Sequence, residues 1–107
     1  MDPTEHLPLA PRDLMILAVL AEGPNHGYGL IKAVEERSRS GVLLDPANLY
    51  RVLRRMRALA WIEDVADGAD RRRTHRITGD GRRVLAAELE RLERLLADAG
   101  PAVAGGG

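Results

Sequence analysis

The chain has 107 residues, which is the size of one domain with a modest hydrophobic core. Its hydrophobic content is 45%, with no Phe, one Trp and two Tyr, so the core must consist mainly of aliphatic side chains, which favours packed helices. The absence of Cys excludes disulfides and thiolate chemistry, and no apolar run approaches the roughly 20 residues of a membrane span. The beginning of the chain lacks the basic and apolar segments of a signal peptide, so we expect a cytoplasmic protein with no membrane association.

The formal net charge is zero, but the positive charge is unevenly distributed along the chain. Residues 45–83 contain ten arginines and six acidic residues, a local excess of +4, whereas the segments before and after them are each net negative. A local positive patch is enough to bind phosphates. The middle of the chain is therefore the candidate for contact with a nucleic acid.

Two helices are expected before this basic segment. Residues 1–10 are rich in proline and are expected to be flexible, and a first helix is expected to begin at Pro11 and end near Ala21. Apolar residues cover nearly its whole circumference, so it needs cover on more than one side, which indicates a partner subunit. A second helix is expected over residues 27–38, with Asn25 as its N-cap. Its outer face carries Lys32, and its predicted inner face holds Tyr28, Leu30, Ile31 and Val34.

Residues 45–60 predict a helix with one apolar side and one basic side. Asp45 is a good N-cap, and Pro46 suits the first helical position. The apolar stripe consists of Leu49, Val52, Leu53, Met56 and Leu59. The other side carries arginines, a tyrosine and an asparagine with no acid, as a nucleic-acid recognition helix does, and the alternative is a charged face that contacts only solvent. With Lys32, the candidate DNA contacts here are Asn48, Tyr50, Arg51, Arg54 and Arg55, while Arg57 has the alternative of pairing with an acid.

After Ala60 the pattern changes from helical to alternating. Residues 61–66 and 72–77 are predicted to be two strands joined by a turn. A basic hairpin tip directly after a recognition helix is typical of a DNA-binding wing, and the alternative is an arginine-rich loop that only contacts water. The candidate DNA contacts of the wing are Arg71, Arg72 and Arg73.

The last predicted helix spans residues 79–99, with Thr78 as its cap and residues 100–107 as a flexible tail. Its leucines follow a spacing of four, three and four residues, which is typical of a coiled-coil seam. We therefore predict a dimerisation helix, with packing inside one subunit as the alternative. The predicted dimer interface combines this seam with the first helix and contains Leu14, Leu17, Leu85, Leu89, Leu92 and Leu96.

The elements together predict a mainly α fold with a small β-hairpin: a winged helix-turn-helix over residues 11–78 and a long C-terminal helix. The three histidines are scattered and lack the spacing of metal ligands, so no catalytic residue, metal or cofactor is expected. The sequence favours two other classes of function over an enzyme. The first is a DNA-binding regulator, and the second is a module that uses its winged surface to bind a protein partner.

The ordered set of motifs resembles the PadR family of bacterial transcriptional regulators, in particular its short members with a single C-terminal helix. The matching segments are ILAVLAEGPNHGYGLIKAVEE (16–36), DPANLYRVLRRMRALAWIE (45–63), DRRRTHRIT (70–78) and GDGRRVLAAELERL (79–92). The resemblance implies a homodimer that represses nearby genes by binding an inverted-repeat operator in double-stranded DNA. It implies that the helix with Asn48, Tyr50, Arg51 and Arg54 enters the major groove. It also implies a small aromatic effector, which in family members often lowers DNA affinity by binding near the dimer interface.

The chain departs from the family pattern in several places, and two of them concern the wing and the ligand site. The returning strand carries Thr74-His75 where aromatic residues are usual, and burial of His75 would make the packing of the wing sensitive to pH. No aromatic residue lies in 79–107, so the residue on which some relatives stack planar ligands has no counterpart there. Trp61 has two interpretations: a core residue where the recognition helix meets the wing, or part of a ligand pocket at the dimer interface.

Overall fold

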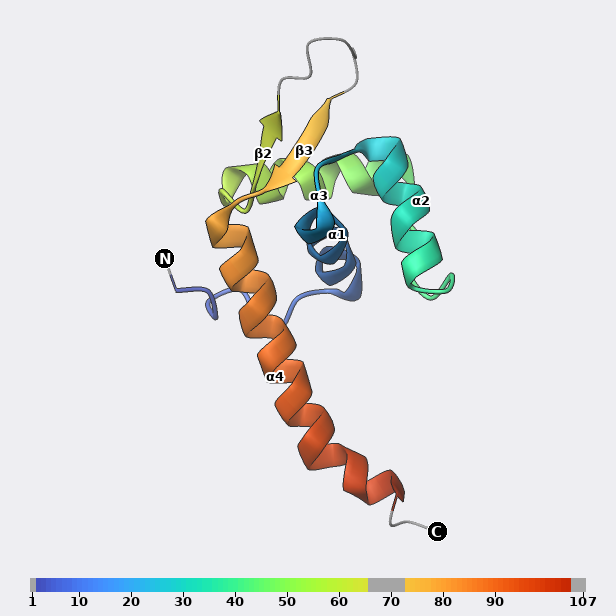
Figure 1. The fold of residues 1–107 in the computed structure, drawn as a ribbon, viewed down its shortest axis with the longest axis vertical. Coiled ribbons are helices and arrows are strands. Elements are labelled where there is room, and N and C mark those ends of the chain that lie inside the picture. The colour runs from blue at the N-terminus through green and yellow to red at the C-terminus, as the bar shows by residue number, and fades with distance from the viewer. Residues whose placement is uncertain (1, 66–72, 105–107) are drawn as a thin grey trace.

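The computed structural model describes residues 2–65 and 73–104. Its elements are α1 (Pro11–Glu22), β1 (Asn25–His26), α2 (Gly27–Arg37), α3 (Pro46–Ala58), β2 (Ile62–Val65), β3 (Thr74–Ile77) and α4 (Gly79–Ala104). Figure 1 shows the first three helices gathered beside the β2–β3 hairpin, while α4 extends away from them as a long arm. The structure confirms the predicted winged helix-turn-helix with a long C-terminal helix. No helix in the described part of the chain is long and apolar enough to cross a membrane.

The hydrophobic core is organised around α1. This helix contacts α2, α4 and β3, so most of the cover that its apolar circumference needs comes from its own chain. Leu17 is fully buried in this core, whereas Leu14 is only partly buried. Each large aliphatic side chain buried in this way contributes roughly 1.5–3 kcal/mol to folding. The other fully buried core residues include Ile16, Leu20, Leu30, Val34, Leu49, Leu53, Met56, Trp61 and Val84.

The beginning of α2 differs from the expectation in two respects. The N-cap is His26, whose Nδ1 accepts a hydrogen bond from the N–H of Gly29 at 3.1 Å. Asn25 instead begins β1, and a Cβ on Gly29 would lie 2.1 Å from its Oδ1, so a side chain at this helical position requires the Asn25 side chain to move. Tyr28 is 69% exposed, because it lies about 200° around the helix from the buried Leu30.

The three strands form an antiparallel sheet in the order β1-β3-β2, with β3 in the centre. In the hairpin Ile62 pairs with Ile77, and Asp64 pairs with His75. His75 also pairs with Asn25 of β1, so the short first strand ties the start of α2 to the wing. The hairpin was predicted from the alternating pattern, but β1 was not, since two residues are too few to show alternation.

The helix α4 has 26 residues and is therefore about 39 Å long. Thr78 caps it as predicted, because its Oγ1 accepts a hydrogen bond from the N–H of Gly81 at 3.1 Å. A Cβ on Gly81 would lie 2.2 Å from the carbonyl oxygen of Trp61, so only glycine allows this close packing. The helix continues through Pro101 to Ala104 instead of ending at residue 99, although a proline inside a helix removes one backbone hydrogen bond and its ring crowds the preceding turn.

The segment before α1 packs against the domain, in contrast to the expected flexible terminus. The imidazole of His6 lies edge-on to the indole of Trp61, with ring centroids 5.4 Å apart. Leu9 is buried, and its N–H donates to Oε2 of Glu88 on α4 at 2.6 Å. Glu88 is itself buried and accepts a hydrogen bond from Nε of Arg91 at 2.5 Å. The segment is thus held between the Trp61 ring and α4.

Replacing Glu88 by Ala should destabilise the fold. Hydrogen bonds from Arg91 hold the pKa of Glu88 below its ordinary value, so its stabilising contribution is present at neutral pH and is lost as the pH falls through the acid range. The variant leaves the buried Leu9 N–H without an acceptor, and we expect a loss of about 1–3 kcal/mol in urea unfolding at pH 7.

The matched control for this experiment is Glu90→Ala on the exposed side of α4. Glu90 is exposed and makes only a loose pair with Arg94 at 3.8 Å, so its loss should stay within about 0.5 kcal/mol. Equal stability of the two variants would show that the contact between Leu9 and Glu88 does not hold the N-terminal segment.

Candidate nucleic-acid interface

The helix α3 is anchored on one side and free on the other, as the sequence predicted. Asp45 caps it by accepting a hydrogen bond from the N–H of Asn48 at 2.9 Å. The buried side is formed by Leu49, Val52, Leu53 and Met56. On the outer side Tyr50 is 66% exposed, and Arg51 and Arg54 are also exposed. The packed side fixes the position of the helix, so the outer side can be presented to a partner without refolding.

Hydrogen bonds order part of the outer side in advance. Nη2 of Arg51 donates to Oδ1 of Asn48 at 2.6 Å, and Nδ2 of Asn48 donates to Oδ2 of Asp45 at 2.5 Å. A guanidinium has five N–H donors, so Arg51 keeps donors for a further partner. Within the described residues Arg54 makes no ion pair with an acid.

Two other arginines of α3 are held by acids from neighbouring elements. Arg55 forms an ion pair with Asp13 of α1, whose side chain is buried, although more than half of the Arg55 side chain stays exposed. Nη1 of Arg57 lies 3.5 Å from Oδ1 of Asp64 on β2. The pairing of Arg57 with an acid was one of the predicted alternatives. The pairing of Arg55 was not predicted, since Asp13 lies 42 residues earlier in the chain.

The carboxylate of Asp64 joins the wing to α3. Oδ1 lies 3.0 Å from Nδ1 of His75, and Oδ2 lies 3.4 Å from Nε of Arg73. Together with the Arg57 contact, three basic side chains converge on one acid. His75 is only 3% exposed, on the same side of β3 as the buried Ile77, as the alternation predicted. The wing and α3 are therefore held together by the contacts of Asp64 as well as by the chain that links them.

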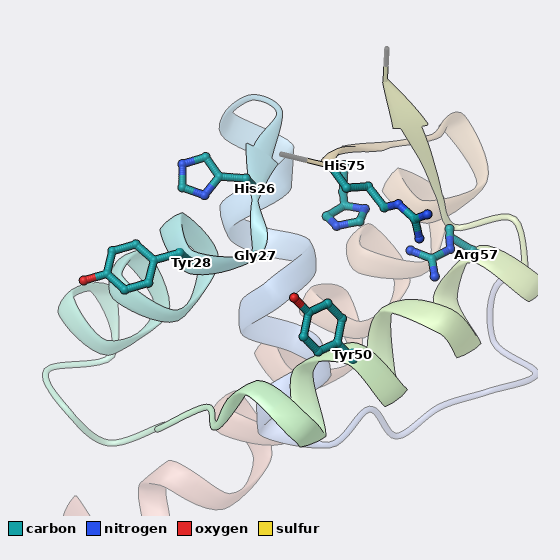
Figure 2. Close-up of a pocket in the computed structure, with 7 residues that line it drawn as sticks. His26, Gly27, Tyr28, Tyr50, Arg57 and His75 are labelled. Carbon is teal, nitrogen blue, oxygen red and sulfur yellow. The ribbon is translucent and has the colours of Figure 1, made fainter. Parts of the chain in front are cut away.

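A cavity of about 380 Å³ opens between the beginning of α2, the outer side of α3 and the wing. In Figure 2, Tyr50 and Arg57 project from α3 into this space, with the Arg57 guanidinium beside His75, while Tyr28 points away. The cavity combines aromatic, imidazole and guanidinium groups, which suits a negatively charged partner. Its lining residues are His26, Gly27, Tyr28, Tyr50, Arg57, Arg73 and His75.

Stability of this region should depend on the protonation of His75. Burial lowers the pKa of His75, the charges of Arg57 and Arg73 act in the same direction, and the contact with Asp64 opposes them. Because the folded pKa lies below the ordinary 6.5, the stabilising contribution is complete above pH 6.5 and is lost as the pH falls toward the folded value.

We therefore expect the urea midpoint of the parent to fall between pH 7.5 and pH 5.5, and to fall less in His75→Gln. One group can change stability by at most about 1.4 kcal/mol per pH unit. His6 and His26 remain in both proteins, so their contribution cancels in the comparison. The same pH dependence in parent and variant would contradict the prediction.

The other predicted site residues are distributed as follows. Lys32 is exposed on α2, while Arg71 and Arg72 lie outside the described residues. Of the leucines predicted for a dimer interface, Leu17 and Leu85 are buried within the protomer, so they offer little or no area to a second subunit. The more exposed ones are Leu89 and Leu96, with Leu14 and Leu92 half-buried.

The structure agrees with the interpretation of Trp61 as a core residue. It is 1% exposed at the corner between α3 and β2. It also lines a second cavity of about 260 Å³. No group of three potential metal ligands occurs among residues 2–65 and 73–104.

The geometry is that of a winged helix with an exposed basic helix, and the comparisons with known proteins agree. The family model described as "Transcriptional regulator PadR-like family" matches residues 16–87. The chain belongs to the PadR-like family of transcriptional regulators. It is also 34% identical over 82 residues to a 37.1 kDa protein in transposon TN4556 of Streptomyces fradiae, covering 77% of this chain and 23% of that protein. The PadR-like chain thus spans about a quarter of the length of this relative.

Solved structures show the same fold for this PadR-like regulator. A transcriptional regulator from Clostridium thermocellum is 25% identical, with a TM-score of 0.71, over 82% of this chain and 88% of that one. A PadR family transcription regulator from Clostridium difficile R20291 is 20% identical, with a TM-score of 0.72, over 85% and 96%. BpsR of Bordetella bronchiseptica, whose DNA binding is regulated by 6-hydroxynicotinic acid, is 22% identical, with a TM-score of 0.66, over 84% and 64%.

Several polar residues of the PadR-like site were missed by sequence reasoning. Asp13 and Asp64 hold arginines of α3, but the pairs are distant in sequence, so no spacing rule identifies them. His26, considered in the sequence as one of three scattered histidines, caps α2 and also lines the larger cavity. The HGY motif at 26–28 was the sequence signal for this place. Its three residues lie where β1 meets α2, and all three line the larger cavity.

Proposed function

We propose that this PadR-like regulator binds an inverted-repeat operator as a homodimer, with one α3 helix of each subunit in the major groove, and that it represses the genes behind that operator. The observation that carries the proposal is the outer side of α3. Its Tyr50, Arg51 and Arg54 are exposed, while its apolar side is locked into the core. A helix of this kind fits the major groove of B-form DNA.

The exposed side chains around α3 are proposed to have different roles in DNA binding, according to their chemistry. Arg51 and Arg54 are proposed to read guanine, because a guanidinium makes two hydrogen bonds to the O6 and N7 edge. Asn48, already oriented by Asp45, is proposed to contact adenine or a phosphate. Lys32, Tyr50 and Arg55 are proposed to hold the DNA backbone, which gives affinity and register without sequence information.

The cavity between α2, α3 and the wing is proposed to receive a backbone phosphate. Arg57 and Arg73 line it, and both are bound to the same Asp64, so the pair keeps a net positive charge in the free protein. The hydroxyl of Tyr50 adds a neutral donor on the other side. Arg71 and Arg72, the remaining arginines of the hairpin, are proposed to extend this backbone contact.

The dimer is proposed to form through α4 with help from α1. Figure 1 shows that the second half of α4 leaves the domain; Leu96 is exposed there, and Leu89 is exposed about two turns earlier on the same helix. With the half-buried Leu14 and Leu92, they form an apolar side that a second copy would cover. A two-fold dimer places its two α3 helices roughly 34 Å apart, which is one turn of DNA.

Relief of repression by a small aromatic effector is part of the proposal. In BpsR, which shares this fold, 6-hydroxynicotinic acid regulates DNA binding. Trp61 lines a cavity that contains neither Arg51 nor Arg54, so a ligand there need not compete with the proposed base contacts.

The test is a salt series with a duplex that carries the region upstream of the gene itself. We expect binding that weakens steeply as salt increases, because phosphate contacts release counterions from the DNA. Absence of binding even at low salt would contradict the proposal. It would favour the alternative in which the winged surface binds a protein partner.

A further inference from the structure

The wing carries one acid within a basic site, and the proposed contact with DNA uses its basic neighbours but not the acid itself. Asp64 of β2 contacts three basic side chains. We call the four residues the Asp64 cluster: Asp64, Arg57 of α3, Arg73 and His75 of β3. The three basic members line the larger cavity, whereas Asp64 is not one of the described residues that line it. The acid therefore meets the proposed phosphate site through its three basic neighbours.

The contacts within the Asp64 cluster differ in length. His75 is held closely, with its Nδ1 3.0 Å from Oδ1 of Asp64. The two guanidinium groups lie farther from the carboxylate, at 3.5 Å for Arg57 and 3.4 Å for Arg73. A charge-assisted hydrogen bond between a guanidinium and a carboxylate measures about 2.7–2.9 Å. The arginines are therefore held by charge rather than by short hydrogen bonds, so an anion with better geometry can take them over from Asp64.

The contact with Asp64 fixes which nitrogen of His75 carries the hydrogen. An ionised carboxylate only accepts hydrogen bonds, so Nδ1 of the neutral imidazole must be the donor. Nε2 is then the acceptor, and it is the atom to which a further proton binds. His75 lines the larger cavity, and a phosphate placed there also brings only acceptors. The neutral imidazole therefore has no second donor for the phosphate, whereas the imidazolium has one.

The charge balance at His75 is set by the Asp64 cluster. Burial aside, the charges that act on this imidazole are those of Asp64, Arg57 and Arg73. β1 brings His26 to the same cavity, where its Nδ1 accepts the hydrogen bond that caps α2, and α3 adds Tyr50. α1 and α4 also contact β3. The charged residues of α1 and of the first two turns of α4 have other partners: Asp13 with Arg12 and Arg55, Glu22 with Arg37, Asp80 with Arg83, and Arg82 with the carbonyl of Ala21.

We propose that Asp64 is an exchangeable counter-ion of Arg57 and Arg73, and that His75 takes up a proton at Nε2 when a DNA phosphate enters the larger cavity. This inference rests on the proposed function. In the free protein Asp64 partly neutralises the two arginines. The phosphate takes over both guanidinium groups, and Asp64 keeps His75 as its partner. The imidazolium then compensates two negative groups, so neither the carboxylate nor the phosphate is left without a positive neighbour.

The direction of the pH dependence follows from these charges. Burial and both arginines lower the pKa of His75 in the free protein. A phosphate in the cavity neutralises the arginines and adds its own negative charge, so it raises the pKa of His75 in the complex. A group that binds a proton more tightly in the complex strengthens binding as the pH falls. The affinity for DNA should therefore increase from pH 8.0 to pH 6.0.

Calorimetric titration of the full chain with a duplex that carries the region upstream of the gene tests the proton uptake directly. The binding heat is measured at pH 6.5 in two buffers with different heats of ionisation, and the difference gives the number of protons exchanged. The parent should take up protons and bind at least about fivefold more tightly at pH 6.0 than at pH 8.0. His75→Gln should show little uptake and a change of at most about twofold.

His6→Gln is the matched control, because His6 packs against Trp61 and does not line the larger cavity. It should take up protons as the parent does. A folded His75→Gln variant with the same proton uptake as the parent would overturn the proposal. Loss of the pH dependence in His26→Gln rather than in His75→Gln would overturn it as well, because it would assign the proton to the other histidine of the cavity.

Asp64→Asn gives a readout that a purely structural role would not give, and it decides the question if His75→Gln does not fold. The amide keeps an acceptor for Nδ1 of His75 but no longer competes with the phosphate for Arg57 and Arg73. The affinity at pH 8.0 should therefore rise about threefold or more, while its dependence on pH becomes weaker. An affinity that falls at every pH would contradict the exchange.

The same titrations separate this inference from the proposed function. A protein that binds no duplex at any pH would overturn the proposed function and the inference with it. Binding to the duplex with no proton uptake, and with equal affinity at pH 6.0 and pH 8.0, would overturn the inference alone.

Discussion

Replacing both Leu89 and Leu96 by Glu should lower the affinity for the full operator at least about a hundredfold. The two side chains are 49% and 73% exposed in the protomer, so the substitutions need not disturb the core. Four like charges along the proposed seam of two α4 helices would prevent pairing. A single subunit then binds one half-site and loses the effective concentration that linkage supplies, which is worth a factor of about 10² to 10⁴.

The measurement combines light scattering for mass with fluorescence anisotropy for operator affinity. The matched control is Ala97→Glu with Arg94→Gln, which makes the same change of −2 in charge at two exposed positions away from the leucine seam. The control should remain a dimer and bind the operator as the parent does. Two results would contradict the proposed dimer through α4. One is a variant with both leucines replaced that is monomeric but binds the operator as the parent does. The other is a variant that stays dimeric.

Arg51→Ala and Arg54→Ala should each cost about 1–3 kcal/mol of operator binding per half-site and relax the sequence preference at one position. Two copies act in a dimer, so the cost to the whole complex is about twice as large. Arg51 also holds Asn48, so its removal frees a second side chain of the interface, whereas Arg54 has no such partner among the described residues. We therefore expect Arg51→Ala to relax preference over a wider stretch than Arg54→Ala.

Binding to a set of single-base operator variants tests these substitutions. Arg94→Ala on α4 serves as control and should leave both affinity and preference unchanged, since among the described residues its one ion pair is with Glu90 of the same helix. If Arg51→Ala binds every operator variant as the parent does, Arg51 does not read a base. A loss that is equal at all positions would assign it to the backbone instead.

The features that could be predicted from the sequence depend on neighbours within a few residues. The start of α3 followed from Asp45 and Pro46, and its buried stripe followed from a spacing that repeats every turn. Thr78 as the cap of α4 and the shared side of His75 and Ile77 followed in the same way. For these elements the preferences of neighbouring residues agree with the packing in the fold, so the sequence pattern was sufficient to predict them.

The features that were missed depend on contacts between distant parts of the chain. β1 exists because Asn25 pairs with His75, fifty residues later, and two residues have no pattern of their own. Asp13 of α1 pairs with Arg55 of α3, and the N–H of Leu9 is held by Glu88 of α4, and both pairs join residues that are far apart in sequence. The burial of Leu17 was missed for the same reason, because α2, α4 and β3 cover much of α1 within one subunit.

The most direct test of the central claim is methylation interference on an operator-containing duplex, which detects contacts to guanine N7 in the major groove. The account predicts two clusters of sensitive guanines, related by the two-fold symmetry of the operator and centred about 10 base pairs apart. Each cluster should weaken in Arg51→Ala and Arg54→Ala. A single cluster, or no guanine at which methylation interferes with binding, would contradict the claim that two α3 helices read successive turns of one major groove.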